Sequence, residues 1–144
     1  TIEQSIDSLK KFRGVKRRMD LVADISNIKV YDDFAHHPTA IKMSSNSIKD
    51  KYPTKKILGI VELGSNTMSS GYHKDNLIES LKILDKTLLL DHNNAYDYLN
   101  GFDSEEKMLD CIRTEILEYD IILIMTNKDS QKFIKPILDS LENK

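Results

Sequence analysis

Two carboxylates and two imidazoles lie close together in the segment YDDFAHHPT, residues 31–39. Side chains of this kind can transfer protons, bind cations or hold polar ligands. Neighbouring side chains on an extended chain point to opposite sides, so only one of Asp32 and Asp33 can face a given ligand. The two acids are therefore not expected to be a pair of catalytic acids that share one site, and the sequence indicates no catalytic residue.

A metal site is not indicated either, because His36 and His37 have no Cys or Glu nearby at the spacing that zinc sites use. Pro38 suits the first position of a helix, so a strand is expected to lead into a helix here. A helix N-terminus favours anions, and a carboxylate there can cap the helix or hold a ribose hydroxyl. We therefore expect Asp33 to serve both the fold and a ligand.

A second cluster is basic, with five Lys or Arg among the nine residues 11–19, KFRGVKRRM. The planar guanidinium groups of Arg17 and Arg18 can pair with phosphate or carboxylate. A solvated charged surface is the commoner explanation of such a run. Gly14 indicates a turn that redirects the chain.

A third cluster, Ser65, Asn66 and Thr67, follows an apolar run and Gly64. Its hydroxyl and amide groups suit a polar substrate, and a simple Asx or Ser turn is an equally good interpretation. The chain contains no Gly-x-x-x-x-Gly-Lys-Ser/Thr motif, so it lacks the usual apparatus that holds and splits ATP. Cys111 is expected to pack within a helix.

The hydrophobic pattern predicts the elements that position these clusters. Strands are expected over residues 21–24, 28–31, 56–62, 87–90 and 121–125, and helices over 38–50, 77–84, 103–117 and 130–141. The first two strands form a hairpin, and a capping pair of Asp103 and Glu106 opens the third helix. The loop segments are 63–71 and 96–102. This alternation predicts an α/β fold with a mostly parallel sheet and helices on both faces.

Ligands of such sheets bind beyond the carboxyl ends of the strands, so we expect the site in the loops after Tyr31, Glu62, Leu90 and Met125. The 144 residues are enough for one domain, and the net charge of -2 makes nucleic acid an unexpected partner. A single cysteine and the lack of a leader or a long apolar run favour the cytoplasm and no membrane contact. The helical spacing at the start of the chain, residues 2–12, indicates a piece of a longer protein.

Three segments together, GVKRRMD (14–20), VYDDFAHHPTAI (30–41) and SNTM (65–68), resemble the C-terminal domain of Mur ligases in order and spacing. The resemblance is dense over residues 12–76 and thin afterwards. It implies a Rossmann-like three-layer sandwich with a short antiparallel strand or hairpin at its start. It also implies that residues 1–144 are one domain of a three-domain enzyme, whose N-terminal domain binds the UDP-sugar and whose central domain carries the P-loop.

The activity that this resemblance implies is amide-bond formation. ATP and Mg²⁺, held mainly by the absent central domain, convert the muramate carboxylate to an acyl phosphate that the substrate amine attacks. Matching the motifs residue by residue, Arg18 would contact ATP phosphate, Asp33 would hold the ribose, and His36 would line the nucleotide or peptide site. Ser65, Asn66 and Thr67 would contact the peptide. Asp32 and His37 would serve the fold, and the domain alone would be inactive.

The implied substrates are UDP-N-acetylmuramate and a murein tripeptide, as in peptidoglycan recycling, with L-alanine addition as the alternative within the family. In the family Pro-Arg usually precedes Ser-Asn-Thr-Met, whereas this chain has Leu63 and Gly64. A positive charge suited to substrate carboxylates is thus missing, and Lys128, in place of a Gly-rich loop, is a candidate replacement. These departures keep open a free-standing nucleotide-binding or peptide-binding module without catalysis.

Overall fold

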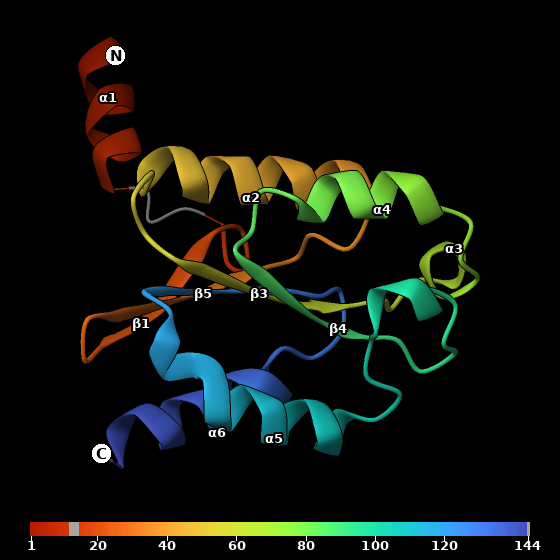
Figure 1. Ribbon diagram of the computed structural model, residues 1–144. Helices are drawn as coiled ribbons and strands as arrows, with labels where there is room; N and C mark the ends of the chain where they lie inside the picture. Colours follow the sequence, from red (N-terminus) through yellow and green to blue (C-terminus); the bar gives the residue numbers. More distant parts are fainter. Residues whose placement is uncertain (12–14, 144) are drawn as a thin grey trace.

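A five-stranded sheet with the order β1-β2-β5-β3-β4 forms the centre of the protein. The computed structural model describes residues 1–11 and 15–143. The strands are β1 (Asp20–Ile25), β2 (Ile28–Asp33), β3 (Ile57–Glu62), β4 (Lys86–Leu90) and β5 (Ile121–Met125). β1 pairs with β2 antiparallel, and the other pairs are parallel. Helices cover both faces of the sheet (Figure 1), which confirms the predicted three-layer α/β sandwich.

The predicted hairpin is formed by β1 and β2, and its strands are longer than expected. Ser26 and Asn27 have φ angles of 54° and 65°. Positive φ at both central residues is the geometry of a two-residue type I′ turn, which matches the twist of the flanking strands. Because two residues suffice for this turn, Ile25 belongs to β1. β2 in turn continues to Asp33, so both acids of the YDDFAHHPT segment are strand residues.

Helices follow the strands much as predicted. They are α1 (Ile2–Lys11), α2 (Pro38–Lys51), α3 (Asn66–Ser69), α4 (Lys74–Leu81), α5 (Glu105–Glu115) and α6 (Gln131–Glu142), with 3-10 turns η1 (Asp97–Leu99) and η2 (Ile116–Glu118). Figure 1 shows α2 and α4 on one face of the sheet and α5 and α6 on the other. The cluster of residues 65–67, predicted to be loop, lies at the start of the one-turn helix α3.

Two further details of the helix predictions were wrong. Ser104, rather than Asp103, caps α5: its side chain accepts a hydrogen bond from the backbone N–H of Lys107 at 3.4 Å. The carboxylate of Asp103 instead contacts the ammonium of Lys107 at 2.8 Å. Leu84 lies beyond the end of α4, in a turn closed by its N–H and the carbonyl of Leu81. Leu84 is nevertheless buried. Its spacing from Leu77 and Leu81 therefore correctly indicated a buried side chain, but not that the helix extends to residue 84.

The strands separate two hydrophobic cores. Ile57 and Val61 of β3 pack beneath α2 and α4, and Leu58 and Ile60 pack beneath α5 and α6. All six residues of β3 are buried, as expected for a strand covered on both faces. Cys111 is half-buried, and its pKa is raised by burial and by the hydrogen bond to Glu115. The predicted packing role of this thiol is therefore confirmed.

The first helix, α1, stands apart from the two layers (Figure 1). Its apolar side chains Ile2, Ile6 and Leu9 are 80%, 45% and 71% exposed. The helical spacing predicted for residues 2–12 is confirmed through Lys11, whereas Phe12 and the turn predicted at Gly14 lie outside the described residues. In the part of the chain that the structure describes, no helix is long and apolar enough to cross a membrane.

Candidate functional site

Parallel pairing places the carboxyl ends of four strands at one edge of the sheet. Asp33 lies beside Met125, Val61 lies beside the same Met125, and Glu62 lies beside Leu90. The four loops in which the sequence predicts ligand contacts therefore meet along this edge, with the first of them beginning after Asp33 rather than after Tyr31. Polar side chains concentrated in these loops form the candidate site, which we call the carboxyl edge.

Asp33 anchors the basic segment to the sheet. Its Oδ2 accepts a hydrogen bond from the N–H of Met19 at 2.7 Å, and its Oδ1 accepts from the N–H of Ala35 at 2.8 Å and from Ser44 Oγ at 3.0 Å. The side chain is buried. A carboxylate has about four acceptor positions, so these three protein donors occupy most of them. The carboxylate does not cap α2, because its donors lie before the helix and within its second turn.

Asp32 points to the other side of β2, as predicted for adjacent strand residues. Its Oδ2 lies 3.2 Å from Arg17 Nε and accepts from Ser130 Oγ at 2.9 Å. Arg17 Nη2 also donates to the carbonyl of Thr126 at 2.7 Å. These contacts join β2 to the loop after β5, which confirms the structural role expected for Asp32. The guanidinium of Arg17, which the sequence offered as a ligand contact, therefore pairs with a protein carboxylate.

The backbone around this pair is strained, since Arg17 and Met19 have φ angles of 58° and 49°. A residue other than glycine in the left-handed region costs roughly 1–2 kcal/mol. The contacts of Asp32 with Arg17 and of Asp33 with Met19 hold the strained segment in place. Asp32 and Asp33 thus together fix the backbone on both sides of Arg18, and with it the direction in which the Arg18 side chain points.

An exposed aromatic ring, Phe34, lies between these groups, and we did not identify it from the sequence. Its ring centroid is 5.2 Å from Arg17 Cζ and 6.0 Å from Arg18 Cζ, and the ring of His36 meets its edge at 5.4 Å. The Nδ1 atom of His36 lies 2.9 Å from the carbonyl oxygen of Phe34. Phe34 is 36% exposed. We call Arg18, Phe34 and His36 the aromatic platform; the signal that could have revealed it is an aromatic residue flanked by charges after a strand.

A buried carboxylate, Glu62, ends the otherwise apolar strand β3. Its Oε2 accepts a hydrogen bond from Thr126 Oγ1 at 2.6 Å, and its Oε1 pairs with the ammonium of Lys132. Lys132 lies within 3.6 Å of Glu105 as well. No sequence pattern marks Thr126 or Lys132 as a site residue. Glu62 thereby links the end of β3 to the loop after β5 and to α6, and Asp32 links the end of β2 to the segment before β1 and to the loop after β5.

The predicted peptide contacts lie in the loop after β3. Ser65 caps α3 by accepting the N–H of Met68 at 3.2 Å, so the Ser-turn interpretation is confirmed for this side chain. Asn66 and Thr67 are exposed at the same turn. The side chain of Lys128 packs against Gly64, at the start of this loop, and Lys128 is exposed. The structure thus brings residues 65–67 and Lys128 together at the carboxyl edge.

The second histidine lies farther along the edge. His37 is the N-cap residue of α2, but its imidazole makes no capping hydrogen bond there and is exposed. Its ring meets that of His73, the N-cap residue of α4, with centroids 4.5 Å apart. A shallow cavity of about 380 Å³ between α2 and α4 is lined by His37, Lys42, Asn76 and Glu79 among others. The structure therefore does not support the fold-stabilising role predicted for His37.

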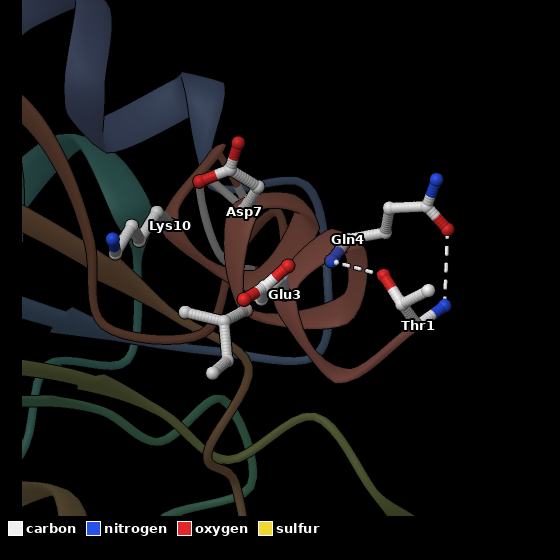
Figure 2. Close-up of a pocket in the computed structure, with 6 residues that line it drawn as sticks. Thr1, Glu3, Gln4, Asp7 and Lys10 are labelled. Atoms are coloured by element: carbon white, nitrogen blue, oxygen red, sulfur yellow. Dashed lines mark hydrogen bonds between the residues drawn. The ribbon is translucent and has the colours of Figure 1, made fainter.

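A hollow of about 540 Å³ lies elsewhere, against the first ten residues. Figure 2 shows that Glu3, Asp7 and Lys10 project from α1 around it, with Gln4 hydrogen-bonded to Thr1. All of its lining residues come from this one stretch of chain. Because no second element of the described chain lines it, this hollow is an open side of a helix, and the carboxyl edge remains the candidate site.

The fold and the carboxyl edge define a Rossmann-like α/β domain that gathers cationic, aromatic and hydroxyl side chains at the strand ends. The family model described as "Mur ligase, glutamate ligase domain" matches residues 17–128. The chain belongs to this family.

Among its relatives is the UDP-N-acetylmuramate–L-alanyl-gamma-D-glutamyl-meso-2,6-diaminoheptandioate ligase of Haemophilus influenzae, 30% identical over 99% of this chain and 34% of the relative. The UDP-N-acetylmuramate–L-alanine ligase of Aquifex aeolicus is 36% identical over 69% of this chain and 22% of that protein. A crystal structure of a murein peptide ligase from Psychrobacter arcticus has a TM-score of 0.77 and 33% identity, covering 96% of this chain and 32% of that one. The chain spans about a third of the length of the Haemophilus protein.

Proposed function

We propose that this chain is the C-terminal domain of an ATP-dependent ligase that joins the tripeptide L-Ala-γ-D-Glu-meso-diaminopimelate to UDP-N-acetylmuramate. The observation that carries the proposal is the similarity to the Haemophilus influenzae ligase over 99% of the chain. The match in fold to the murein peptide ligase of Psychrobacter arcticus, with a TM-score of 0.77, supports it. In this proposal the N-terminal and central domains of the same polypeptide complete the enzyme.

The proposed reaction forms one amide bond and converts ATP to ADP and phosphate. The muramate carboxylate takes the γ-phosphoryl group of ATP as an acyl phosphate, and the free amine of the tripeptide displaces phosphate from it. Mg²⁺ would neutralise the phosphate charges, and it would be held mainly by the central domain, because this chain has no P-loop. The part of this chain would be to bind and orient, which agrees with carboxylates that are occupied by protein donors at the strand ends.

The expected test result is release of phosphate by the full-length protein that contains this chain, only when UDP-N-acetylmuramate, the tripeptide and MgATP are all present. L-Alanine in place of the tripeptide is the second arm, because the Aquifex aeolicus L-alanine ligase is 36% identical to this chain. Release with L-alanine and not with tripeptide would assign the second function. No release with any amino acid or peptide would leave a nucleotide-binding or peptide-binding module without catalysis.

The aromatic platform is the proposed nucleotide contact of this domain. Arg18 is exposed and, within the described residues, pairs with no carboxylate, so its guanidinium is available to ATP phosphate. The remaining acceptor position of Asp33 would hold a ribose hydroxyl, and His36 would line the same site. The ring of Phe34, a residue that is 36% exposed, lies beside Arg18 and could contact a nucleobase or ribose.

Arg18→Ala is therefore expected to raise the KM for ATP of the full-length ligase roughly 10-fold or more, because a charge-assisted hydrogen bond is lost. The KM for the tripeptide should change little. Arg113→Ala, which removes an exposed arginine on α5 that pairs with Asp110, is the matched control and should leave both constants unchanged. Steady-state phosphate release at varied ATP measures the effect. An equal KM for ATP in both variants would exclude Arg18 from the nucleotide site.

A further inference from the structure

Gly64 lets two residues of the loop after β5 lie directly on the loop after β3. A Cβ atom built on Gly64 would lie 2.2 Å from Asn127 Oδ1 and 2.9 Å from both Cγ and Cε of Lys128. Real Cβ atoms do not approach other atoms so closely. The aliphatic stem of Lys128 therefore runs across the face of Gly64, in the space that any other side chain at residue 64 would fill.

The backbone of Lys128 is fixed by a chain of hydrogen bonds that reaches the buried end of β3. The N–H of Lys128 donates to Thr126 Oγ1 at 3.0 Å, and that hydroxyl donates to Glu62 Oε2 at 2.6 Å. Glu62 is held in turn by Lys132. Both the backbone and the stem of Lys128 are therefore positioned, which lowers the entropy that its ammonium loses when it binds a partner.

Among the described residues, the ammonium of Lys128 has no ion-pair partner, in contrast to the neighbouring cations. Arg17 and Lys132, the two cations beneath the same edge, pair with Asp32 and Glu62. Lys128 is exposed, and no described carboxylate lies within ion-pair distance of its ammonium. Residue 64 also connects directly to Ser65 at the start of the hydroxyl-bearing turn. A positive charge that pairs with no carboxylate in residues 1–11 and 15–143 thus lies beside the groups suited to a polar peptide.

We propose that Lys128 binds a carboxylate of the peptide that supplies the amine, and that Gly64 is required because it admits the lysine stem. Lys128 would then make the ligase prefer amine substrates that carry a suitably placed carboxylate. This inference rests on the proposed function, since it names the residue that recognises the second substrate. It assigns no catalytic step to Lys128, whose ammonium contacts the peptide away from the bond that forms.

The test uses the full-length ligase, and it compares the tripeptide with analogues in which each carboxylate in turn is a neutral amide. Lys128→Met is expected to raise the KM for the tripeptide roughly 10- to 100-fold, the value of one hydrogen bond between charged groups. The KM for ATP should stay at its wild-type value. Amidation of the recognised carboxylate should raise the wild-type KM by a similar factor and should change the KM of Lys128→Met little.

Controls separate recognition from folding. Lys128→Arg keeps the charge and should retain most of the affinity, and Lys135→Met removes an exposed lysine from α6 and should have no effect. Gly64→Ala should raise the tripeptide KM as well, because the added Cβ displaces the lysine stem; its thermal unfolding curve shows whether the fold is kept.

Two results would overturn the inference. In the first, every amide analogue raises the peptide KM of wild type and of Lys128→Met by the same factor; in the second, Lys128→Met leaves the tripeptide KM unchanged. In both cases ligation itself would still support the proposed function. If the wild-type enzyme ligates no amine at all, the proposed function fails, and the inference fails with it.

Discussion

Replacing Asp33 by alanine is expected to lower the free energy of unfolding of this 144-residue chain by about 2–5 kcal/mol. The carboxylate accepts hydrogen bonds from Met19 N–H, Ala35 N–H and Ser44 Oγ at 2.7–3.0 Å, and it is 3% exposed. Its loss leaves two backbone donors without an acceptor in a part-buried region and releases the strained segment at Met19. Urea unfolding followed by circular dichroism measures the change.

Two variants sharpen this experiment. Asp33→Asn keeps one acceptor oxygen and should cost less, about 1–2 kcal/mol. Asp50→Ala removes an exposed carboxylate from α2 and should change the stability by no more than about 0.5 kcal/mol. In the full-length ligase, Asp33→Ala should also raise the KM for ATP. A stable Asp33→Ala variant would show that the observed contacts are not what holds the segment, and an effect confined to the tripeptide KM would exclude the proposed ribose contact.

Glu62→Ala is expected to lower the free energy of unfolding by about 2–4 kcal/mol. Removing one partner of a fully buried ion pair costs about 3–5 kcal/mol, and this value is reduced here because the side chain of Lys132 is 21% exposed and can reach water. Thr126, which is fully buried, also loses the acceptor of its hydroxyl. Thermal or urea unfolding of the domain gives the change.

The contribution of the pair itself comes from a double-mutant cycle with Lys132→Met. Because the two side chains are in contact, the two losses should not add, and a coupling of about 1 kcal/mol or more is expected. Glu118→Ala, an exposed glutamate in η2, is the matched control and should leave the stability nearly unchanged. Strict additivity of the Glu62 and Lys132 variants would show that the ion pair contributes nothing.

Most of the fold was predictable because its elements are marked by local patterns. Continuous apolar runs identified β3, β4 and β5, and the Ser-Asn turn identified the β1–β2 hairpin. The parallel arrangement was predicted, but the strand order β1-β2-β5-β3-β4 was not. Local patterns do not reveal this order, because the pairing of β2 with β5 joins residues about 90 positions apart in the chain. The one-turn helix α3 was missed because four residues carry no helical periodicity.

The sequence predicted where the polar loops meet in the fold, but it predicted few of the contacts that their side chains make. Arg17 and Arg18 are adjacent and chemically identical, and the sequence could not say which of them pairs with Asp32. Phe34 became part of the site only when the chain placed both guanidinium groups beside its ring. The sequence singles out Asp33, and its role in the fold is confirmed by its three protein donors, which the sequence did not reveal; its contact with a ligand stays a prediction.

The sequence by itself determined the α/β class, the family and the edge of the sheet at which the polar loops meet, because hydrophobic periodicity and short motifs are local properties of the chain. Only the tertiary structure decided which charges are occupied and which are free. Asp32, Asp33 and Glu62 bond to residues up to 98 positions away, whereas the ammonium of Lys128 is left without a partner among the described residues. The physical reason is that a charged group pairs with the opposite charge or hydrogen-bond donor that the fold brings within about 3 Å of it. The order of the strands and the geometry of the loops set these distances.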